Sequence, residues 1–452
     1  MIEDTIAAIA TPIGEGALAV IRLSGKNALT IAAECFKPIG NSSFSPTEAD
    51  THTVHYGKII SGEREIDEVL ISVMLAPRTF TRENVVEITC HGGMVASRSV
   101  LQAVLSAGAR SAEPGEFTRR AFINGRIDLA QAEAVSDVIQ AHTDLALAAA
   151  NEQLGGKLSQ RINHLRDELM HTLAHIEAHI DFPDEDISPN TMAQLKGRLE
   201  AAMAFIDELL ATADEGRILR RGIRAVIVGR PNSGKSSLLN QLLGHDRAIV
   251  ATTAGTTRDT IEETANIRGI PVVFIDTAGL REATNEVEAE GIRRSHDSIS
   301  RAELILHVID ASEALTEEDR LYLEQFAIRK RVIIANKMDL PRILEFEEEC
   351  VETSATQGIG IEALKDAIRD KVWSGEIQAD MLPAMINARH QDALVRAQEG
   401  VKQSLHTLGP DAPLELVAAD LRIATNAVGE VVGKTSTEDL LDSIFSQFCI
   451  GK

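Results

Sequence analysis

The chain has 452 residues, of which 44% are hydrophobic and 25% charged, so it has average globular composition and enough length for two to four domains. Its 45 Lys and Arg residues stand against 68 Asp and Glu, a net charge of −23, and only 3% of residues are aromatic. The negative net charge excludes a protein whose whole surface is basic and binds nucleic acid electrostatically, and the low aromatic content leaves few rings to stack on bases.

Neither membrane insertion nor secretion is expected. No run approaches about 18 consecutive apolar residues, and the first residues lack the basic region of a signal peptide. The four cysteines are scattered without a C-x-x-C pair, which excludes a zinc knuckle and a disulfide framework: Cys35, Cys90, Cys350 and Cys449. We therefore expect a cytoplasmic protein with no membrane partner.

Residues 1–120 predict a mixed α and β domain. Four runs rich in β-forming residues are separated by clusters of Gly, Pro, Ser and Asn, as strands joined by turns usually are. The runs cover 16–25, 52–60, 67–75 and 84–93, and a helical pattern covers 94–108. This segment is therefore expected to fold as an α+β domain.

Long amphipathic helices are expected in two separate stretches, 121–215 and 379–452. In the first stretch, apolar residues at steps of three or four predict one long helix with a single buried stripe. The residues of the stripe are Ile162, Leu165, Leu169, Leu173, Ile176 and Ile180. The two stretches together predict one all-α domain.

Residues 216–378, between the helical stretches, alternate β-rich runs with helical patterns. The runs are 224–229, 272–277, 303–310 and 331–337. Such βα alternation is typical of a parallel sheet covered by helices. The sequence therefore predicts a multidomain α/β and all-α protein, in which a parallel-sheet α/β domain is inserted into the helical domain.

The sharpest motif is GRPNSGKS, residues 229–236, which lies between a predicted strand and a predicted helix. Backbone amides of such a loop, together with the N-terminus of the following helix, hold phosphate oxygens. Lys235 would supply positive charge to the β and γ phosphates, and Ser236 a hydroxyl ligand to Mg²⁺. The motif predicts a P-loop that binds a nucleoside triphosphate.

Three further motifs follow in order. DTAG (276–279) offers Asp276 to Mg²⁺ through water and the Gly279 amide to the γ-phosphate. NKMD (336–339) offers Asn336 and Asp339 to the guanine edge, and SAT (354–356) offers a backbone amide to guanine O6. Because adenine does not present the N1–H and 2-amino donors together, the set predicts GTP over ATP.

A segment rich in Thr and Gly, 251–260, is typical of a switch loop, and Thr257 is its expected hydroxyl ligand to Mg²⁺. Leu280 follows DTAG where Ras-like GTPases carry the Gln that orients water, so hydrolysis needs another polar group and another positive charge. The expected GTP-binding residues are Gly229, Asn232, Ser233, Gly234, Lys235, Ser236, Ser237, Ala251, Thr252, Thr253, Ala254, Gly255, Thr256, Thr257, Asp276, Thr277, Ala278, Gly279, Asn336, Lys337, Asp339, Ser354, Ala355 and Thr356.

With their flanking segments, these motifs resemble the MnmE (TrmE) family of tRNA wobble-uridine modification GTPases, which are potassium-activated. The resemblance is carried by residues 4–25, 114–135, DFPDED, the P-loop, AGTTRD, DTAGLR and the terminal FCIGK. It implies an N-terminal folate-binding-like domain that forms a homodimer, and a heterotetramer with an FAD-dependent MnmG-like partner. The implied reaction adds an aminomethyl or carboxymethylaminomethyl group to C5 of U34 in tRNA.

The resemblance also implies roles for single residues. Asn232 is expected to bind K⁺, with loop carbonyls of Ala251, Thr253 and Thr256 completing the shell, so that the ion replaces an arginine finger. Glu288 is expected to orient the attacking water and completes the catalytic set with Lys235 and Asn232. A 5-formyl- or 5,10-methylene-tetrahydrofolate is expected at Arg22, Glu83, Arg126 and Lys452, although some relatives have Lys at position 126.

Three alternatives stay open at this point. The chain could instead be a ribosome-assembly GTPase, a binding switch without one-carbon chemistry, which FCIGK and the N-terminal region disfavour. Cys449 is either a nucleophile or a packing residue beside the folate pocket. A basic cluster at the entry to the inserted domain either pairs with acidic groups of the protein or contacts tRNA: Arg217, Arg220, Arg221 and Arg224.

Overall fold

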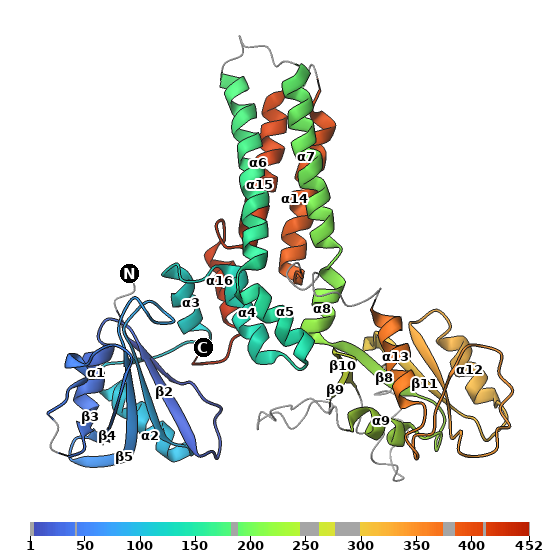
Figure 1. The fold of residues 1–452 in the computed structure, drawn as a ribbon, viewed down its shortest axis with the longest axis horizontal. Coiled ribbons are helices and arrows are strands. Elements are labelled where there is room, and N and C mark those ends of the chain that lie inside the picture. The colour runs from blue at the N-terminus through green and yellow to red at the C-terminus, as the bar shows by residue number, and fades with distance from the viewer. Residues whose placement is uncertain are drawn as a thin grey trace. The chain divides into compact units, whose positions relative to one another are not determined.

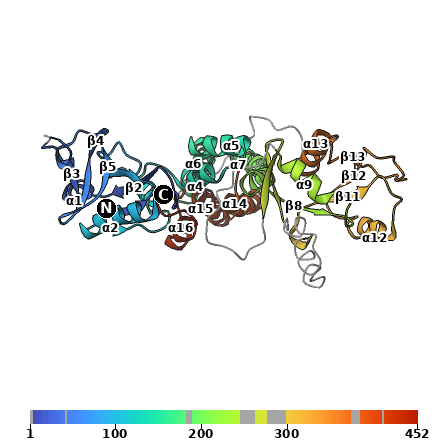
Figure 2. The same cartoon turned by 90° about the horizontal axis from the view of Figure 1, so that it is seen from below.

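A computed structural model describes residues 4–40, 43–181, 189–244, 262–275, 299–373, 385–409 and 413–451 (Figures 1 and 2). Its contacts divide the chain into two compact units. Unit 1 comprises Met1–Ser136, Ser159–Arg166 and Asn426–Lys452, and unit 2 comprises Asp137–Leu158 and Asp167–Thr425. The predicted helical residues are thus shared between the two units, and the three predicted domain boundaries stay a prediction.

Unit 1 is built on a seven-stranded sheet with the order β3-β4-β5-β6-β2-β1-β7. Buried and more exposed residues alternate along its long strands, because one face packs on a core. The strands are β1 Ile6–Ile9, β2 Leu18–Ser24, β3 Phe36–Pro38, β4 Thr53–Ser61, β5 Arg64–Met74, β6 Val85–His91 and β7 Arg110–Ser111. Four of them confirm the predicted runs, and the short β1, β3 and β7 were not predicted.

Three helices pack on the sheet of unit 1, two of them in one large core and the third in a separate, smaller cluster (Figure 1). Helices α1 (Ala28–Cys35) and α2 (Met94–Ser106) share one hydrophobic core with inward residues of the sheet such as Ile71 and Ile88. Near β1, Phe117 of α3 (Glu116–Ile123) packs with Ile6, Ala8, Ala112 and Phe80 in a separate cluster. Helix α2 confirms the helix predicted over 94–108.

The last residues of the chain return to the N-terminal sheet domain. Phe445 of helix α16 (Glu438–Phe445) and Phe448, which follows the helix, pack against the start of α4 (Leu129–Gln140). A bridge then pairs Ile450 with Pro114, and the Gly451 carbonyl accepts a hydrogen bond from Arg22 Nη1 at 3.3 Å. The terminal FCIGK segment is therefore part of unit 1.

Unit 2 contains α7, α14 and most of α6 and α15, four long helices that lie side by side in both views (Figures 1 and 2). They are α6 Lys157–Asp181, α7 Pro189–Leu210, α14 Ala388–Thr407 and α15 Leu414–Val431, accompanied by the shorter α5 Asp144–Leu154 and α8 Ala213–Arg221. The predicted stripe is confirmed in α6, where five of its residues are buried and Ile180 is half-buried. No helix in the described ranges has the length and apolar character to cross a membrane.

The second sheet of the chain, in unit 2, has the order β13-β12-β11-β8-β10-β9. The strands are β8 Ile223–Val228, β9 Glu263–Ile267, β10 Ile270–Phe274, β11 Leu304–Asp310, β12 Arg331–Asn336 and β13 Val351–Glu352. All neighbours are parallel except β9 and β10. Arg268 and Gly269 join these two strands with φ of 56° and 87°, the two-residue turn of a tight hairpin, so the predicted parallel sheet carries an antiparallel edge.

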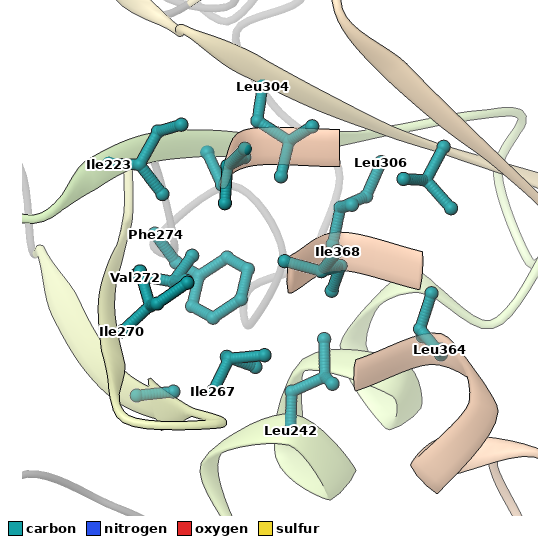
Figure 3. Packing of buried hydrophobic residues seen from close by; sticks show 14 of the residues in the cluster. Ile223, Leu242, Ile267, Ile270, Val272, Phe274, Leu304, Leu306, Leu364 and Ile368 are labelled. Carbon is teal, nitrogen blue, oxygen red and sulfur yellow. The ribbon is translucent and has the colours of Figure 1, made fainter. Parts of the chain in front are cut away.

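Helices cover both faces of this sheet. On one face, α9 (Lys235–Leu243) and α13 (Ile361–Val372) bury Leu242, Leu364 and Ile368 against strand residues such as Val272 and Leu306 (Figure 3). On the other face, α12 (Glu317–Gln325) and the following Phe326 close a smaller core. This packing fixes the junction of β8 and α9 at the carboxyl edge of the parallel strands, where ligands of α/β proteins usually bind.

Candidate functional site

The P-loop, residues 229–236, joins β8 to α9. Gly229 and Gly234 have positive φ, 142° and 96°. An added Cβ would lie 2.2 Å from the Val308 carbonyl oxygen at Gly229 and 2.1 Å from Asn336 Nδ2 at Gly234. Only glycine allows the loop backbone to approach the neighbouring strands this closely. The close approach brings the first-turn amides of α9 to the expected phosphate site.

Lys235 is held by the loop that carries it. Its Nζ donates to the carbonyl oxygens of Gly229 at 2.8 Å and Arg230 at 2.7 Å. Burial lowers the pKa of Lys235 from its ordinary value, and nearby Glu318 opposes this shift. The ammonium group is therefore positioned at the phosphate-binding loop, as the sequence predicts for the β and γ phosphates.

The P-loop is also tied to the N-terminus of α12. Arg230 Nε donates to Asp319 at 3.0 Å, and its Nη2 donates to Glu313 at 3.1 Å. Asp319 is fully buried and forms a capping box with Thr316 at the start of α12. This connection restrains the loop from the side opposite α9, and sequence analysis did not single out Arg230.

Asn336 links the P-loop to the SAT segment. Its Nδ2 donates to the Ser233 carbonyl at 2.9 Å, and its Oδ1 accepts from the Ala355 amide at 3.0 Å and the Thr353 hydroxyl at 3.2 Å. The side chain is only 2% exposed. Asn336 thus joins the phosphate and base ends of the predicted nucleotide site through three hydrogen bonds.

Asp339 lies beside the same SAT segment. One of its carboxylate oxygens accepts from Ser354 Oγ at 2.6 Å, and Ser354 Oγ lies 3.1 Å from Thr356 Oγ1. Lys337, between Asn336 and Asp339, has a φ of 68° and pairs through Nζ with Asp310 at 2.6 Å. The NKMD and SAT motifs are therefore adjacent in space, which is the arrangement needed to recognise guanine.

These segments enclose a cavity of about 640 Å³, within the usual range for small-molecule sites. Its lining contains Pro231, Asn232, Gly234, Lys235, Ser236, Ser237, Asn336, Lys337, Asp339, Leu340, Ala355 and Thr356. The structure thus brings the described P-loop, NKMD and SAT residues together, including the predicted Mg²⁺ ligand Ser236 and K⁺ ligand Asn232. Residues 251–257, 276–279, Leu280 and Glu288 lie outside the described residues.

A second cavity, of about 260 Å³, lies in unit 1 on the sheet face opposite the core of α1 and α2. Arg22 and Glu87 occupy paired positions on β2 and β6, and Arg22 Nε donates to Glu87 at 2.7 Å. Arg22 also lies 5.8 Å from the Phe117 ring centroid. The lining residues are Arg22, Met74, Phe80, Thr81, Val85, Glu87, Thr118 and Val135.

Glu83, predicted to bind folate, does not belong to this lining. Its carboxylate accepts from Ser24 Oγ at 2.6 Å and from the buried Arg120 at 3.3 Å. The acid that pairs with Arg22 is Glu87, which sequence analysis did not single out. Its signal was the alternation of β6, which places Glu87 on the face opposite the buried Val86 and Ile88.

The predicted folate residue Arg126 lies at the edge of the same cavity. Its Nη1 donates to the Thr79 carbonyl at 2.8 Å, and its Cζ lies 5.2 Å from the centroid of Phe80, a lining residue. The fourth predicted folate residue, Lys452, lies outside the described residues. Arg22 and Glu87 therefore line this cavity, and Arg126 contacts its lining residue Phe80.

Three members of the basic cluster at the entry to the inserted domain pair with acidic side chains of the protein, among them Arg224 with Glu262 at 3.9 Å. Arg217 pairs with Glu303, and Arg220 with Asp137 at 2.8 Å. These pairs favour the interpretation that the cluster binds within the protein. Cys449 is exposed, and its carbonyl accepts from the Gly115 amide at 3.4 Å.

Two family models together match almost the whole chain. The model for the GTP-binding protein TrmE N-terminus matches residues 5–126, and that for the MnmE helical domain matches 129–449. The tRNA modification GTPase MnmE of Geobacillus kaustophilus is 47% identical over 460 residues, covering 99% of both chains. That of Clostridioides difficile is 46% identical over 459 residues, covering 100% of both. The chain belongs to the MnmE family.

This membership confirms the resemblance and the predicted fold class, and, together with the nucleotide site, makes the chain a GTP hydrolase. Solved structures that are similar to it include the G domain of the T. maritima FeoB iron transporter, at 24% identity and a TM-score of 0.24. That match covers 33% of this chain and 98% of the FeoB chain. Because the cavity is lined by the P-loop, NKMD and SAT residues of an MnmE-family chain, it is called the GTP site below.

Proposed function

We propose that this MnmE-family chain hydrolyses GTP to drive modification of C5 of the wobble uridine, U34, in tRNA. With an FAD-dependent MnmG-like partner in a heterotetramer, it adds an aminomethyl or carboxymethylaminomethyl group. A tetrahydrofolate derivative supplies the one-carbon unit. The observation that carries the proposal is that one chain holds both the GTP site and a separate cavity with an arginine and a glutamate, within a family whose relatives are named tRNA modification GTPases.

The second cavity, which is lined by Arg22 and Glu87 and is called the Arg22 cavity from here on, has the chemistry that a reduced folate requires. A pterin presents N–H donors along one edge, which suit the Glu87 carboxylate, and an apolar ring, which suits Phe80 and Val85. Arg22 and Arg126 add positive charge for the carboxylates of the glutamyl part. We therefore assign the folate to Arg22, Glu87 and Arg126, with Glu83 acting through the buried Arg120 network instead of through contact with the ligand.

Hydrolysis is proposed to depend on ions held at the GTP site. Ser236 and Thr257 would hold Mg²⁺, and Asn232 with carbonyls of the 251–256 loop would hold K⁺. Bound K⁺ would neutralise charge that develops on the transferring phosphoryl group, a task that is worth about 10³–10⁵ in rate when an arginine finger performs it. Lys235 positions the phosphates. Leu280 has no hydrogen-bonding group, and the family resemblance assigns the orientation of the attacking water to Glu288.

A homodimer through unit 1 is supported by an apolar strip on its sheet. Tyr56 and Leu70 are paired across β4 and β5, and they are 51% and 44% exposed. Val54, two residues before Tyr56 on the same face, is 62% exposed. Exposed apolar neighbours on a sheet are typical of a surface that another chain covers, and a second copy is the proposed occupant.

A ribosome-assembly switch is the competing function, and it would have no use for a folate cavity. The two functions differ in what happens to tRNA when the gene is lost. In a strain that lacks the gene, mass spectrometry of tRNA nucleosides should show unmodified wobble uridine, and the unaltered gene should restore the modified form.

Complementation with variants separates the two sites. Lys235→Ala, at the GTP site, and Arg22→Ala, at the folate cavity, should both fail to restore the modified nucleoside. Lys58→Ala, which removes only a surface pair with Glu65, should restore it. Normal wobble nucleosides in the strain lacking the gene would rule out the proposed function.

A further inference from the structure

Two short segments are joined by hydrogen bonds at the edge of the Arg22 cavity. Thr79, Phe80 and Thr81 belong to the first segment, and its Phe80 and Thr81 line the cavity. The second segment is the turn at Asn124, whose Nδ2 donates to the Thr81 carbonyl at 2.7 Å. Arg126 Nη1 donates back to the Thr79 carbonyl at 2.8 Å. These contacts form a defined rim, with residues 79–82 on one side and 124–126 on the other.

Arg82 occupies an unusual position on this rim. Its φ is 58°, in the left-handed region that glycine adopts without strain and other residues seldom adopt. Its Nη1 donates to the Asn124 carbonyl at 3.0 Å, so the side chain extends across to the other side of the rim. Strained non-glycine residues concentrate at functional sites, so the strained Arg82 is a candidate for binding a ligand through its guanidinium group.

The rim carries positive charge that the described part of the chain does not neutralise. Arg82 and Arg126 are both exposed, and each donates to a main-chain carbonyl through a single Nη1 group. Within the described ranges neither forms a salt bridge with a carboxylate. A guanidinium has five N–H donors, so both retain donors for an external anion.

We propose that Arg82 and Arg126 bind the γ-glutamyl carboxylates of a folate whose ring system lies in the Arg22 cavity. This inference rests on the proposed function, and it extends that function to the oligoglutamyl forms of the cofactor. Each added γ-glutamyl residue brings one more carboxylate, and planar guanidinium groups match carboxylates through two parallel hydrogen bonds. Because Arg82 follows the lining residue Thr81 directly, a tail that leaves the cavity across this rim meets its side chain first.

Calorimetry with mono- and triglutamyl 5-formyl-tetrahydrofolate tests the inference on the full chain. The triglutamyl form should bind the unaltered protein about threefold to tenfold more tightly, as expected for added charge-assisted contacts at an exposed site. In Arg82→Gly the ratio of the two affinities should fall to about one. This substitution relieves the positive φ, so a folding defect is not expected.

Two further variants separate charge from backbone conformation. Arg82→Gln retains a donor for the Asn124 carbonyl but removes the charge, and it should lose the preference as Arg82→Gly does. His52→Gly is the matched control, because His52 is also exposed in unit 1 with a φ of 63° and is not part of the rim. It should keep the ratio of the unaltered protein.

The outcomes are distinct. Equal affinity of the unaltered protein for the two folates would overturn the inference, and so would a preference that persists in both Arg82 variants. If the Arg82 variants weaken binding of tRNA while the folate ratio is unchanged, the rim serves RNA phosphates and the inference is wrong. If neither folate binds at all, the proposed folate function fails together with the inference.

Discussion

Replacement of Asn336 by alanine should lower both the stability of the predicted inserted α/β domain, residues 216–378 and called the G domain below, and its affinity for GTP. The substitution removes three hydrogen bonds and leaves the Ser233 carbonyl and the Ala355 amide without their partner. Both residues are buried, and an unsatisfied buried main-chain group costs about 1–2 kcal/mol or more. We therefore expect the free energy of unfolding of the G domain to fall by about 2–4 kcal/mol and the affinity for GTP to fall at least about tenfold.

The fluorescence of Trp373 in urea provides the assay for stability. It is the only tryptophan of the chain, it is 3% exposed, and it belongs to the same core cluster as Leu238 and Leu242 of α9. Its emission therefore reports unfolding around the P-loop helix, even though a chain of several domains does not unfold in one step. Calorimetry with GTP measures the affinity of each variant.

Two further variants serve as comparisons for Asn336→Ala. Asn336→Asp keeps an acceptor for the Ala355 amide but places a carboxylate oxygen against the Ser233 carbonyl, so it breaks the P-loop connection alone. Asn266→Ala removes one bond to the Gly269 amide in the β9–β10 hairpin, and it should cost about 1 kcal/mol without changing GTP affinity. A stability within about 0.5 kcal/mol of the unaltered protein, with unchanged GTP affinity, would refute the role assigned to Asn336.

Four further predictions concern other parts of the chain. His307 is buried with a pKa lowered to about 4, mainly by burial, so the unfolded chain binds a proton between pH 6.5 and 4 that the folded chain does not. The stability present above pH 6.5 should therefore fall by about 3 kcal/mol on acidification to pH 4, and urea unfolding of His307→Leu should lack this slope. Asp339→Asn should lower GTP affinity at least about tenfold in a binding titration and favour xanthosine triphosphate, because an amide adds a donor. GTP hydrolysis should be faster in KCl than in NaCl at equal ionic strength, and equal rates in the two salts would exclude the potassium mechanism. Glu288→Ala should lower kcat by about 100-fold or more with little change in nucleotide affinity. Removal of residues 449–452 should weaken 5-formyl-tetrahydrofolate binding, measured by calorimetry, while GTP hydrolysis is spared, since Gly451 contacts Arg22.

The sequence predicts the parts of the fold that follow from local patterns. Long apolar runs predicted β8, β11 and β12, and the stripe at steps of three and four predicted α6. Strand β10 was predicted too, but β9 and its hairpin with β10 were not, because the turn, Arg268-Gly269, lacks the Asn-Gly or Asp-Gly signal that usually identifies such a turn. The described P-loop, NKMD and SAT residues lie together as expected because these motifs have fixed positions after strands.

The cavity lined by Arg22 and Glu87 was harder to predict, because it depends on register between strands that are distant in the sequence. Pairing of Arg22 with Glu87 follows from the alignment of β2 with β6, which local sequence does not determine. The same holds for Arg120, which is fully buried and bonds Asp4, Glu83 and Glu116. Glu83 was predicted to bind folate from the family resemblance alone, and local sequence did not indicate that its carboxylate belongs to this network.

We propose that GTP hydrolysis at the P-loop drives chemistry on the wobble uridine. A reconstituted reaction that contains this chain, an FAD-dependent MnmG-like partner, tRNA, the one-carbon folate and an amino donor tests this claim. Mass spectrometry should detect the C5-modified uridine with GTP and no more than a trace with a non-hydrolysable GTP analogue. Equal product with the two nucleotides would contradict the claim.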